Sequence, residues 1–266
     1  NILGPGMVID IESLSEELEE LEKAGISVDN IRISDRATIT FPFHRMEDNL
    51  EEDRLGGAAF GSTRRGIAYA YGERYMKKSI QVGELFYPDE LKKRIYGLAE
   101  WKNLLFKNIY NSNETLDPEK VLQWLDKYGS KIKKYVCDTT SLLEESAANG
   151  KKVLFEAQLG SLRDIYYGIY PFTTSSCTLA SYAPVGGGLS NKRIDKVIGV
   201  MKSFSSCVGA GPFVTEMPDE EAGSLREIAM EYGASTGRPR RIGHFDAVAT
   251  RYGAMVQGVD EIALTK

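Results

Sequence analysis

Three arginines stand within four residues near the C-terminal end of the sequence, and this density is its clearest sign of a chemical site. They are Arg238, Arg240 and Arg241, and the Ser-Thr-Gly run of residues 235–237 precedes them. Like charges packed this densely repel one another unless an anion neutralises them. Guanidinium groups bind carboxylates and phosphates through paired hydrogen bonds. The loop therefore predicts a binding site for an anion, either a carboxylate or a phosphate.

Two further segments carry groups that suit a phosphate. Residues 61–66 combine two glycines, two hydroxyls and two guanidiniums, and residues 173–176 are all Ser or Thr. Glycine lets backbone amides approach an anion closely, and the side chains add donors. A solvated basic turn explains the first segment equally well, and a strand edge with Ser/Thr turns explains the second. Neither segment decides the function by itself.

Histidine and cysteine add little to these candidates. The chain has two histidines, which excludes a multi-histidine metal site. The setting of His44 is more typical of a packed histidine than of a catalyst. His244 follows the arginine loop and is the better functional candidate, although a structural role is favoured. The three cysteines are widely spaced and odd in number, which argues against a disulfide framework and favours a reducing cytoplasm: Cys137, Cys177 and Cys207.

Composition and charge exclude several classes of protein. The 266 residues are 42% hydrophobic and 27% charged, which is ordinary for a globular chain with a sizeable core. Lys and Arg number 33 against 38 Asp and Glu, so a global basic surface for nucleic acid is absent. No apolar run approaches the roughly 20 residues of a membrane span. We therefore expect neither a nucleic acid nor a membrane as partner.

The elements that must position these groups alternate between strand and helix. This alternation predicts an α/β fold with a large, mostly parallel central sheet, helices on both faces and a helical insertion, in one domain over residues 1–266. Apolar runs predict a strand, a turn and a second strand in residues 2–9, and further strands at residues 31–33, 37–41, 153–155, 197–201 and 261–264. We expect the last of these strands to be buried.

Three helices are predicted by apolar spacing and by terminal signals. The first begins at the capping box of residues 13–16 and ends at Gly25; the others cover residues 225–232, ended by Gly233, and 245–256. Residues 91–150 differ from the rest because they are poor in glycine and rich in Lys, Glu, Leu and Tyr. Asp117 followed by proline is typical of a helix start. We interpret residues 91–150 as a helical subdomain.

The chain opens and closes on sequence that is typical of interior strands. Residues 2–9 and 261–266 lack the features of a natural terminus, and position 1 is not methionine. We therefore expect the chain to be a segment of a longer protein.

Several long motifs resemble those of the adenylosuccinate synthetase family. Residues 208–216 read VGAGPFVTE where the family has V-G-x-G-P-F-P-T-E. Residues 235–244 read STGRPRRIGH, similar to T-T-G-R-x-R-R-x-G-W. Residues 170–176 and 33–37 read YPFTTSS and ISDRA, similar to Y-P-x-V-T-S-S and I-S-D-R-A. The final Leu-Thr-Lys of residues 264–266 looks like the start of the family's guanine-recognition segment. The resemblance runs almost from end to end and is weakest in the predicted helical subdomain.

The resemblance implies a GTP-dependent ligase of purine (AMP) biosynthesis. The family joins L-aspartate to C6 of inosine monophosphate (IMP), using GTP and Mg²⁺, and forms adenylosuccinate. GTP phosphorylates the C6 oxygen, and the aspartate amine then displaces phosphate, so the protein mainly positions substrates and neutralises charge. The resemblance also implies a cytoplasmic homodimer with shared sites.

The resemblance assigns roles to individual residues. Those implied to bind aspartate are Ser235, Thr236, Gly237, Arg238 and Arg240. Those implied to bind IMP are Thr63, Lys77, Gln158, Thr174 and Arg238. Those implied to bind GTP are Arg240 and Lys266. Lys77 stands where the family has an arginine that reaches the IMP phosphate in the partner's site; a lysine keeps the charge and loses the bidentate contact.

The sequence departs from the family pattern at several of these places. In residues 155–160, which read FEAQLG, the substrate-binding glutamine comes one place early as Gln158, and Leu159 holds its position. Cys177 and His244 stand where the family has asparagine and tryptophan. These departures leave two alternatives open. One is a non-catalytic nucleotide-binding paralogue with a regulatory role, and the other is a ligase with an altered nucleotide or amino-acid substrate.

The family's phosphate loop and its N-A-G-H segment are expected upstream of Asn1. They hold the catalytic aspartate, the catalytic histidine and the Mg²⁺ ligands of the family. The resemblance therefore places no catalytic residue and no metal ligand within this segment. We predict that residues 1–266 alone neither hydrolyse GTP nor form adenylosuccinate.

Overall fold

The computed structural model describes residues 1–157, 159–233 and 237–266, which its contacts divide into two compact units. The N-terminal unit consists of Asn1–Arg54, Arg64–Phe155 and Pro184–Lys192. The C-terminal unit consists of Leu55–Thr63, Glu156–Ala183 and Arg193–Lys266. The expected single domain over residues 1–266 and the expected helical subdomain at residues 91–150 stay predictions. Residues 91–150 lie within the N-terminal unit.

Parallel strands form the sheets of the N-terminal unit. The strand β3 (Arg32–Ser34) lies between β1 (Ile2–Leu3) and β5 (Val136–Cys137), and both neighbours pair with it in parallel. A second parallel pair joins β2 (Val8–Ile9) to β4 (Thr38–Ile39). The predicted strand, turn and strand at residues 2–9 is confirmed, as are the strands at residues 31–33 and 37–41. Ile33 and Ile39 are fully buried, which explains why these short apolar runs form interior strands.

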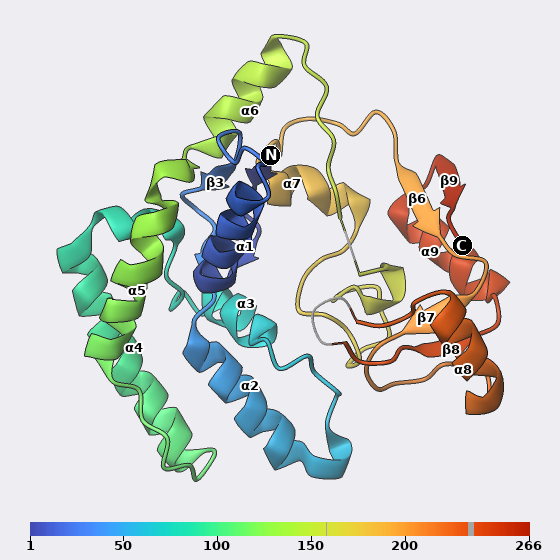
Figure 1. Ribbon diagram of the computed structural model, residues 1–266, viewed down its shortest axis with the longest axis horizontal. Helices are drawn as coiled ribbons and strands as arrows, with labels where there is room; N and C mark the ends of the chain where they lie inside the picture. Colours follow the sequence, from blue (N-terminus) through green and yellow to red (C-terminus); the bar gives the residue numbers. More distant parts are fainter. Residues whose placement is uncertain (158, 234–236) are drawn as a thin grey trace. The chain divides into compact units, whose positions relative to one another are not determined.

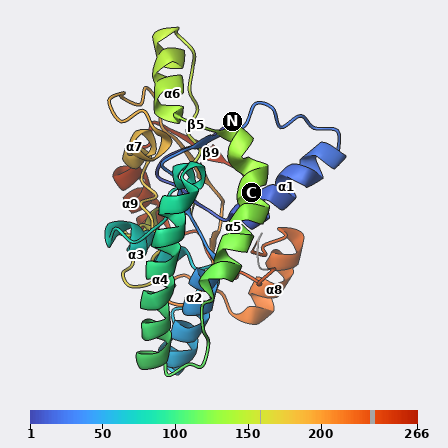
Figure 2. The same ribbon diagram turned by 90° about the vertical axis from the view of Figure 1, so that its left-hand side faces the viewer.

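Seven α-helices of the described residues have most or all of their length in the N-terminal unit: α1 (Ile11–Lys23), α2 (Pro42–Leu55), α3 (Ile67–Tyr75), α4 (Pro88–Asn108), α5 (Pro118–Ile132), α6 (Thr139–Ala148) and α7 (Ala183–Gly187). The long helices α4 and α5 lie side by side (Figures 1 and 2), and α1 also packs on α5. The predicted start at Asp117 is confirmed, because its side chain accepts from Glu119 N at the head of α5.

The predicted N-cap of the first helix, Ser13, comes three residues late. The helix α1 begins at Ile11, and its N-cap is Asp10, whose carboxylate accepts from the amides of Glu12 and Ser13. Ile11 is fully buried, so the core needs this residue inside the helix. The predicted end at Gly25 is confirmed by its φ of 76°, which favours glycine.

A buried ionic cluster lies among α2, α3 and α4. The ammonium of Lys102, which has no exposed surface, bridges the carboxylates of Glu47 and Glu73. His44 Nε2 lies 3.0 Å from Glu73 Oε2, and His44 Nδ1 accepts a hydrogen bond of 3.0 Å from Phe41 N. Because Nδ1 accepts, the proton of the neutral ring is on Nε2 and is donated to Glu73. His44 is therefore a packed histidine, as the sequence favoured.

We expect the stability of the fold to fall as the pH is lowered below about 6.5, the usual pKa of histidine. Burial lowers the pKa of His44, so the unfolded chain takes up a proton that the native protein does not bind. The free energy of unfolding should then fall by up to about 1.4 kcal/mol per pH unit from this residue. Urea unfolding between pH 7 and pH 5 measures the slope. His44→Gln should show a shallower slope, and an unchanged slope would contradict the assignment.

The described strands of the C-terminal unit form two two-stranded sheets. The strand β6 (Ile198–Met201) pairs in parallel with β9 (Glu261–Leu264), and β7 (Ser205–Cys207) pairs in antiparallel with β8 (Arg241–Gly243). Two α-helices lie entirely within its described residues: α8 (Asp219–Ile228) and α9 (Ala247–Gln257). The described strands confirm an α/β fold with mainly parallel pairing, and they are grouped into one three-stranded sheet and three two-stranded sheets.

Three expectations for particular segments are wrong. Residues 153–155 form no strand; the Phe155 ring instead packs against Gly187, where an added Cβ would lie 2.5 Å from it. The strand β9 is exposed along its length and not buried. The helix α8 ends at Ile228, before the predicted residue 232, because Met230 adopts a φ of 53°, outside the helical region.

No helix among residues 1–157, 159–233 and 237–266 has both the length and the apolar character needed to cross a lipid bilayer.

Candidate active site

The arginine loop is hydrogen-bonded to residues 61–63, the first half of the predicted phosphate-binding segment, within the C-terminal unit. The guanidinium of Arg238 donates to the carbonyl oxygen of Gly61 at 3.1 Å and to that of Ser62 at 3.3 Å. Gly61 has a φ of 72°, which favours glycine. Arg238 therefore holds the backbone that leads directly into Thr63, whose side chain is exposed.

The loop of residues 208–216 is attached to both of these segments. Ala210 N donates to the carbonyl of Phe60 at 3.2 Å. Arg241 donates to the carbonyls of Gly209 at 3.2 Å and Gly211 at 2.9 Å. The arginine loop thus contributes two guanidiniums that shape neighbouring backbone.

The hydroxyl-rich segment of residues 170–176 packs against the same loop. An added Cβ at Gly211 would lie 2.7 Å from the ring of Phe172, so a larger residue would displace it. Arg163 donates to the carbonyls of Phe172 and Val208, the latter at 3.2 Å. The carbonyl of Arg163 in turn accepts from Thr174 N at 2.7 Å. Four motif segments that are far apart in sequence therefore converge in one unit.

Arg240 and Arg241 have carboxylate partners among the described residues. Arg241 makes a paired contact with Glu216, with nitrogen–oxygen distances of 2.6 and 2.5 Å, and this holds the pKa of Glu216 below its usual range. Arg240 lies 3.3 Å from the buried carboxylate of Glu231. Carboxylates of the chain itself therefore share in neutralising the loop, and the predicted binding of an external anion stays a prediction. These partners lie 25 and nine residues away in sequence, so residue density in the loop could not reveal them.

The structure places most of the predicted site residues in the C-terminal unit. They are Thr63, Thr174, Gly237, Arg238, Arg240 and Lys266. Lys77 belongs to the N-terminal unit, follows α3 with a φ of 62° and is exposed. Its neighbour Lys78 stacks on the Trp101 ring, 4.2 Å from the ring centroid. Gln158, Ser235 and Thr236 lie outside the described residues.

His244, the other histidine considered as a functional residue, is tied to neighbouring backbone. His244 is exposed, and its backbone N–H donates to the carbonyl of Thr215 at 2.9 Å. Sequence reasoning missed Arg163 and Glu231, which no motif singles out. No local signal marks Glu231, because its partners Lys202 and Lys266 lie 29 and 35 residues away in sequence.

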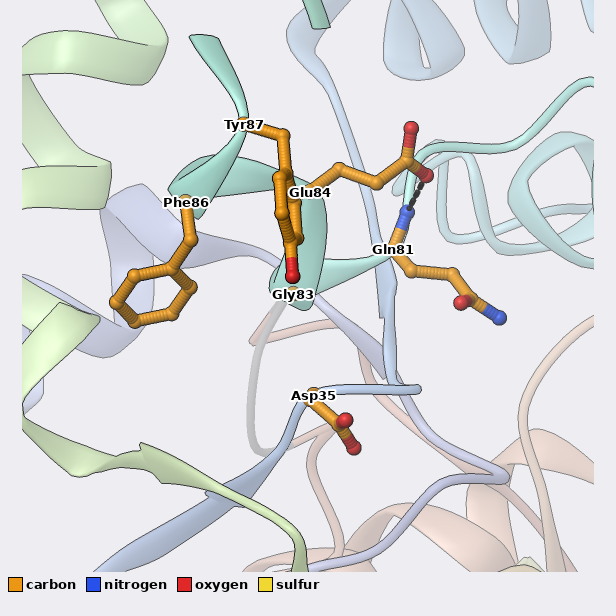
Figure 3. Close-up of a pocket in the computed structure, with 6 residues that line it drawn as sticks. All are labelled: Asp35, Gln81, Gly83, Glu84, Phe86 and Tyr87. Carbon is orange, nitrogen blue, oxygen red and sulfur yellow. Dashed lines mark hydrogen bonds between the residues drawn. The ribbon is translucent and has the colours of Figure 1, made fainter. Parts of the chain in front are cut away.

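A pocket of the N-terminal unit holds none of the predicted site residues. It has a volume of about 300 Å³ and is lined by Asp35, Gln81, Gly83, Glu84, Phe86 and Tyr87. Figure 3 shows the Glu84 carboxylate accepting from Gln81 N, at 2.8 Å, while Asp35 comes from a separate segment. No cluster of three or more metal-ligating side chains occurs in the described part of either unit.

Comparison with known proteins identifies the family. The family model of adenylosuccinate synthetase matches residues 1–266. The chain belongs to the adenylosuccinate synthetase family.

Relatives in the family cover the whole chain. It is 50% identical over 266 residues to adenylosuccinate synthetase 2 of Pseudoalteromonas translucida, covering 63% of that protein. It is 45% identical over 265 residues to adenylosuccinate synthetase of a Thermoanaerobacter species, covering 62% of it. The chain thus spans slightly less than two thirds of the length of these relatives.

Solved structures agree with this assignment. The fully ligated adenylosuccinate synthetase of Plasmodium falciparum matches all of the chain with a TM-score of 0.91 and 34% identity, over 61% of its own length. A succinoaminodeoxyadenylate synthetase of cyanophage S-2L shares the fold, with a TM-score of 0.64 and 22% identity. The α/β fold and the family that the motifs indicated are confirmed.

Proposed function

We propose that the full-length protein carrying this chain is a GTP-dependent ligase that joins L-aspartate to IMP and forms adenylosuccinate. The observation that supports this most is the contact of Arg238 with the carbonyls of Gly61 and Ser62. It brings the segment assigned to aspartate and ribose against the segment assigned to the IMP phosphate. Two motifs that are far apart in sequence can bind parts of the same substrate complex only if the fold brings them into contact.

The roles of the chain's own residues follow from their chemistry. The guanidiniums of Arg238 and Arg240 bind carboxylate and ribose oxygens, together with Ser235, Thr236 and the amide of Gly237. The hydroxyls of Thr63 and Thr174 donate to the IMP phosphate, with Gln158 beside the nucleotide. Arg240 and Lys266 face GTP. In the reaction the C6 oxygen of IMP attacks the γ-phosphorus and GDP leaves; the aspartate amine then attacks C6, and phosphate departs with that oxygen.

Mg²⁺ would neutralise charge on the transferred phosphoryl group when bound. The described residues present no fitting set of ligands, so we assign this chain no step that depends on the metal. With free thiols at all three cysteines, we propose the cytoplasm as the compartment.

An altered nucleotide substrate is the second candidate, and Leu159 favours it. Leu159 is 58% exposed and has a φ of 88°, a conformation that favours glycine, at the place of the family's glutamine. An apolar side chain cannot supply the donors and the acceptor of an amide. Comparing kcat/KM for IMP with that for other purine monophosphates separates the two candidates.

We further propose a homodimer in which Lys77 of one subunit reaches the IMP phosphate of the other. Lys77→Ala and Arg238→Ala subunits should each be impaired alone and should recover activity when mixed. With random exchange, half of the dimers are mixed and one of their two sites carries neither change, so about a quarter of normal activity should return. Sedimentation of the full-length protein at saturating substrate measures its oligomeric state, and a monomer would contradict the proposal. No recovery in a mixture proven to exchange would refute the shared site.

A further inference from the structure

A buried carboxylate gathers three cations in the C-terminal unit. Glu231 is 1% exposed and lies between the end of α8 and the arginine loop. Both of its carboxylate oxygens accept from Lys202 Nζ at 2.6 Å. Lys266 Nζ lies 3.1 Å from Oε1, and Arg240 lies 3.3 Å from Oε2. Arg240 N also donates to the Glu231 carbonyl at 2.9 Å.

The charges of this cluster do not balance. Burial alone would raise the pKa of Glu231, but hydrogen bonds from Lys202 and Lys266 outweigh it and hold the pKa below its usual range, so the group is ionised. One negative charge then faces three positive charges. Buried Arg240 Nε has no hydrogen-bond partner in the described part of the chain. The cluster thus keeps positive charge and a donor available for a further anion.

The cluster lies at the carboxyl ends of two parallel strands, which is where α/β proteins bind ligands. Lys202 directly follows β6, and Lys266 comes two residues after β9; these strands pair in parallel, with Met201 opposite Leu264. Ser203 N donates to the Lys266 carbonyl at 2.8 Å, which holds the two strand ends together. Ligands of open α/β sheets bind at the carboxyl ends of parallel strands. Lys266 and Arg240 are partly exposed there, while Glu231 is not.

We propose that Glu231 is a positioning residue for the guanine nucleotide. Its buried carboxylate holds Arg240 and Lys266 in the arrangement that GTP requires, and it links the arginine loop to the end of β9. Lys202 keeps the carboxylate ionised and in place. The proposal rests on the function proposed above, in which Arg240 and Lys266 face GTP.

Steady-state kinetics of the full-length protein test this role. Glu231→Gln keeps the shape of the side chain and removes its charge, so Arg240 and Lys266 lose their shared anchor. We expect KM for GTP to rise roughly tenfold, because small displacements of binding groups are costly. KM for IMP should change less than twofold. Glu221→Gln, an equal charge change at an exposed position of α8, should leave both constants unchanged.

Two further variants separate positioning from mere stabilisation. Leu225→Ala, which removes packing from the small core of the same unit and leaves the cluster intact, should also lower the melting temperature, yet leave KM for GTP within twofold. If KM for GTP follows the melting temperature in both variants, Glu231 is only structural and the proposal is wrong. Should Glu231→Gln fail to fold, Glu231→Asp keeps the charge on a shorter side chain. A selective rise in its KM for GTP supports the proposal, and unchanged KM values contradict it.

If Glu231→Gln leaves KM for GTP unchanged, Lys266→Met shows whether the GTP assignment or only the positioning role of Glu231 is wrong. An unchanged KM for GTP in this variant would overturn the GTP assignment itself. A raised KM in Lys266→Met with no change in Glu231→Gln would overturn only the positioning role.

Discussion

Replacing Arg238 by alanine should raise KM for aspartate by roughly one to two orders of magnitude. The variant removes a charge-assisted contact worth about 1.5–3 kcal/mol. It also removes the hydrogen bonds to the carbonyls of Gly61 and Ser62, so we expect a smaller rise in KM for IMP. Initial rates of the full-length protein at varied aspartate and saturating IMP and GTP measure the effect.

Arg251→Ala is the matched control for this experiment. Arg251 is exposed on α9 in the same unit, and we assign it no ligand. Its removal changes the net charge equally and should leave KM for aspartate unchanged. An Arg238→Ala variant with normal aspartate dependence would show that the arginine loop does not bind this substrate.

Replacing Lys102 by methionine should lower the free energy of unfolding by about 3–5 kcal/mol. The change leaves the buried carboxylates of Glu47 and Glu73 without the ammonium between them, and uncompensated buried charge is strongly destabilising. Burial already raises the pKa of Glu47, so this group should take up a proton in the variant. Equilibrium unfolding in urea measures the loss.

Two variants control for the loss of a lysine and for the loss of packing. Lys93→Met, at an exposed position of the same helix α4, should change stability by less than about 0.5 kcal/mol. Adding Glu47→Gln and Glu73→Gln to Lys102→Met should restore part of the stability, because the stranded charges are then gone. A loss below 1 kcal/mol in Lys102→Met would show that water reaches the cluster.

The sequence marked the parts of the candidate site whose residues are local in sequence. The density of Arg238, Arg240 and Arg241 identified the loop, and motif order identified the segments that it contacts. The carboxylates that neutralise two of these arginines were not predictable, because Glu216 and Glu231 reach them through the fold. A charge is visible in a sequence, whereas its partner depends on tertiary contacts.

The same limit applies to the fold. Strands 31–33 and 37–41 and the start at Asp117 have strong local signals, and the structure confirms them. Residues 153–155 were ambiguous because a short apolar run fits a strand or any buried segment. For α1, both Asp10 and Ser13 can cap a helix, and burial of Ile11 decides between them.

The fate of the C6 oxygen of IMP tests the central claim most directly. If the full-length protein phosphorylates this oxygen with GTP before aspartate displaces it, isotopically labelled oxygen at C6 must leave in the phosphate. Mass spectrometry of the phosphate formed from labelled IMP, GTP and L-aspartate detects it. We predict one labelled oxygen in each phosphate, adenylosuccinate in equal amount, and no product when any one substrate is omitted. Unlabelled phosphate, or phosphate released without adenylosuccinate, would contradict the account.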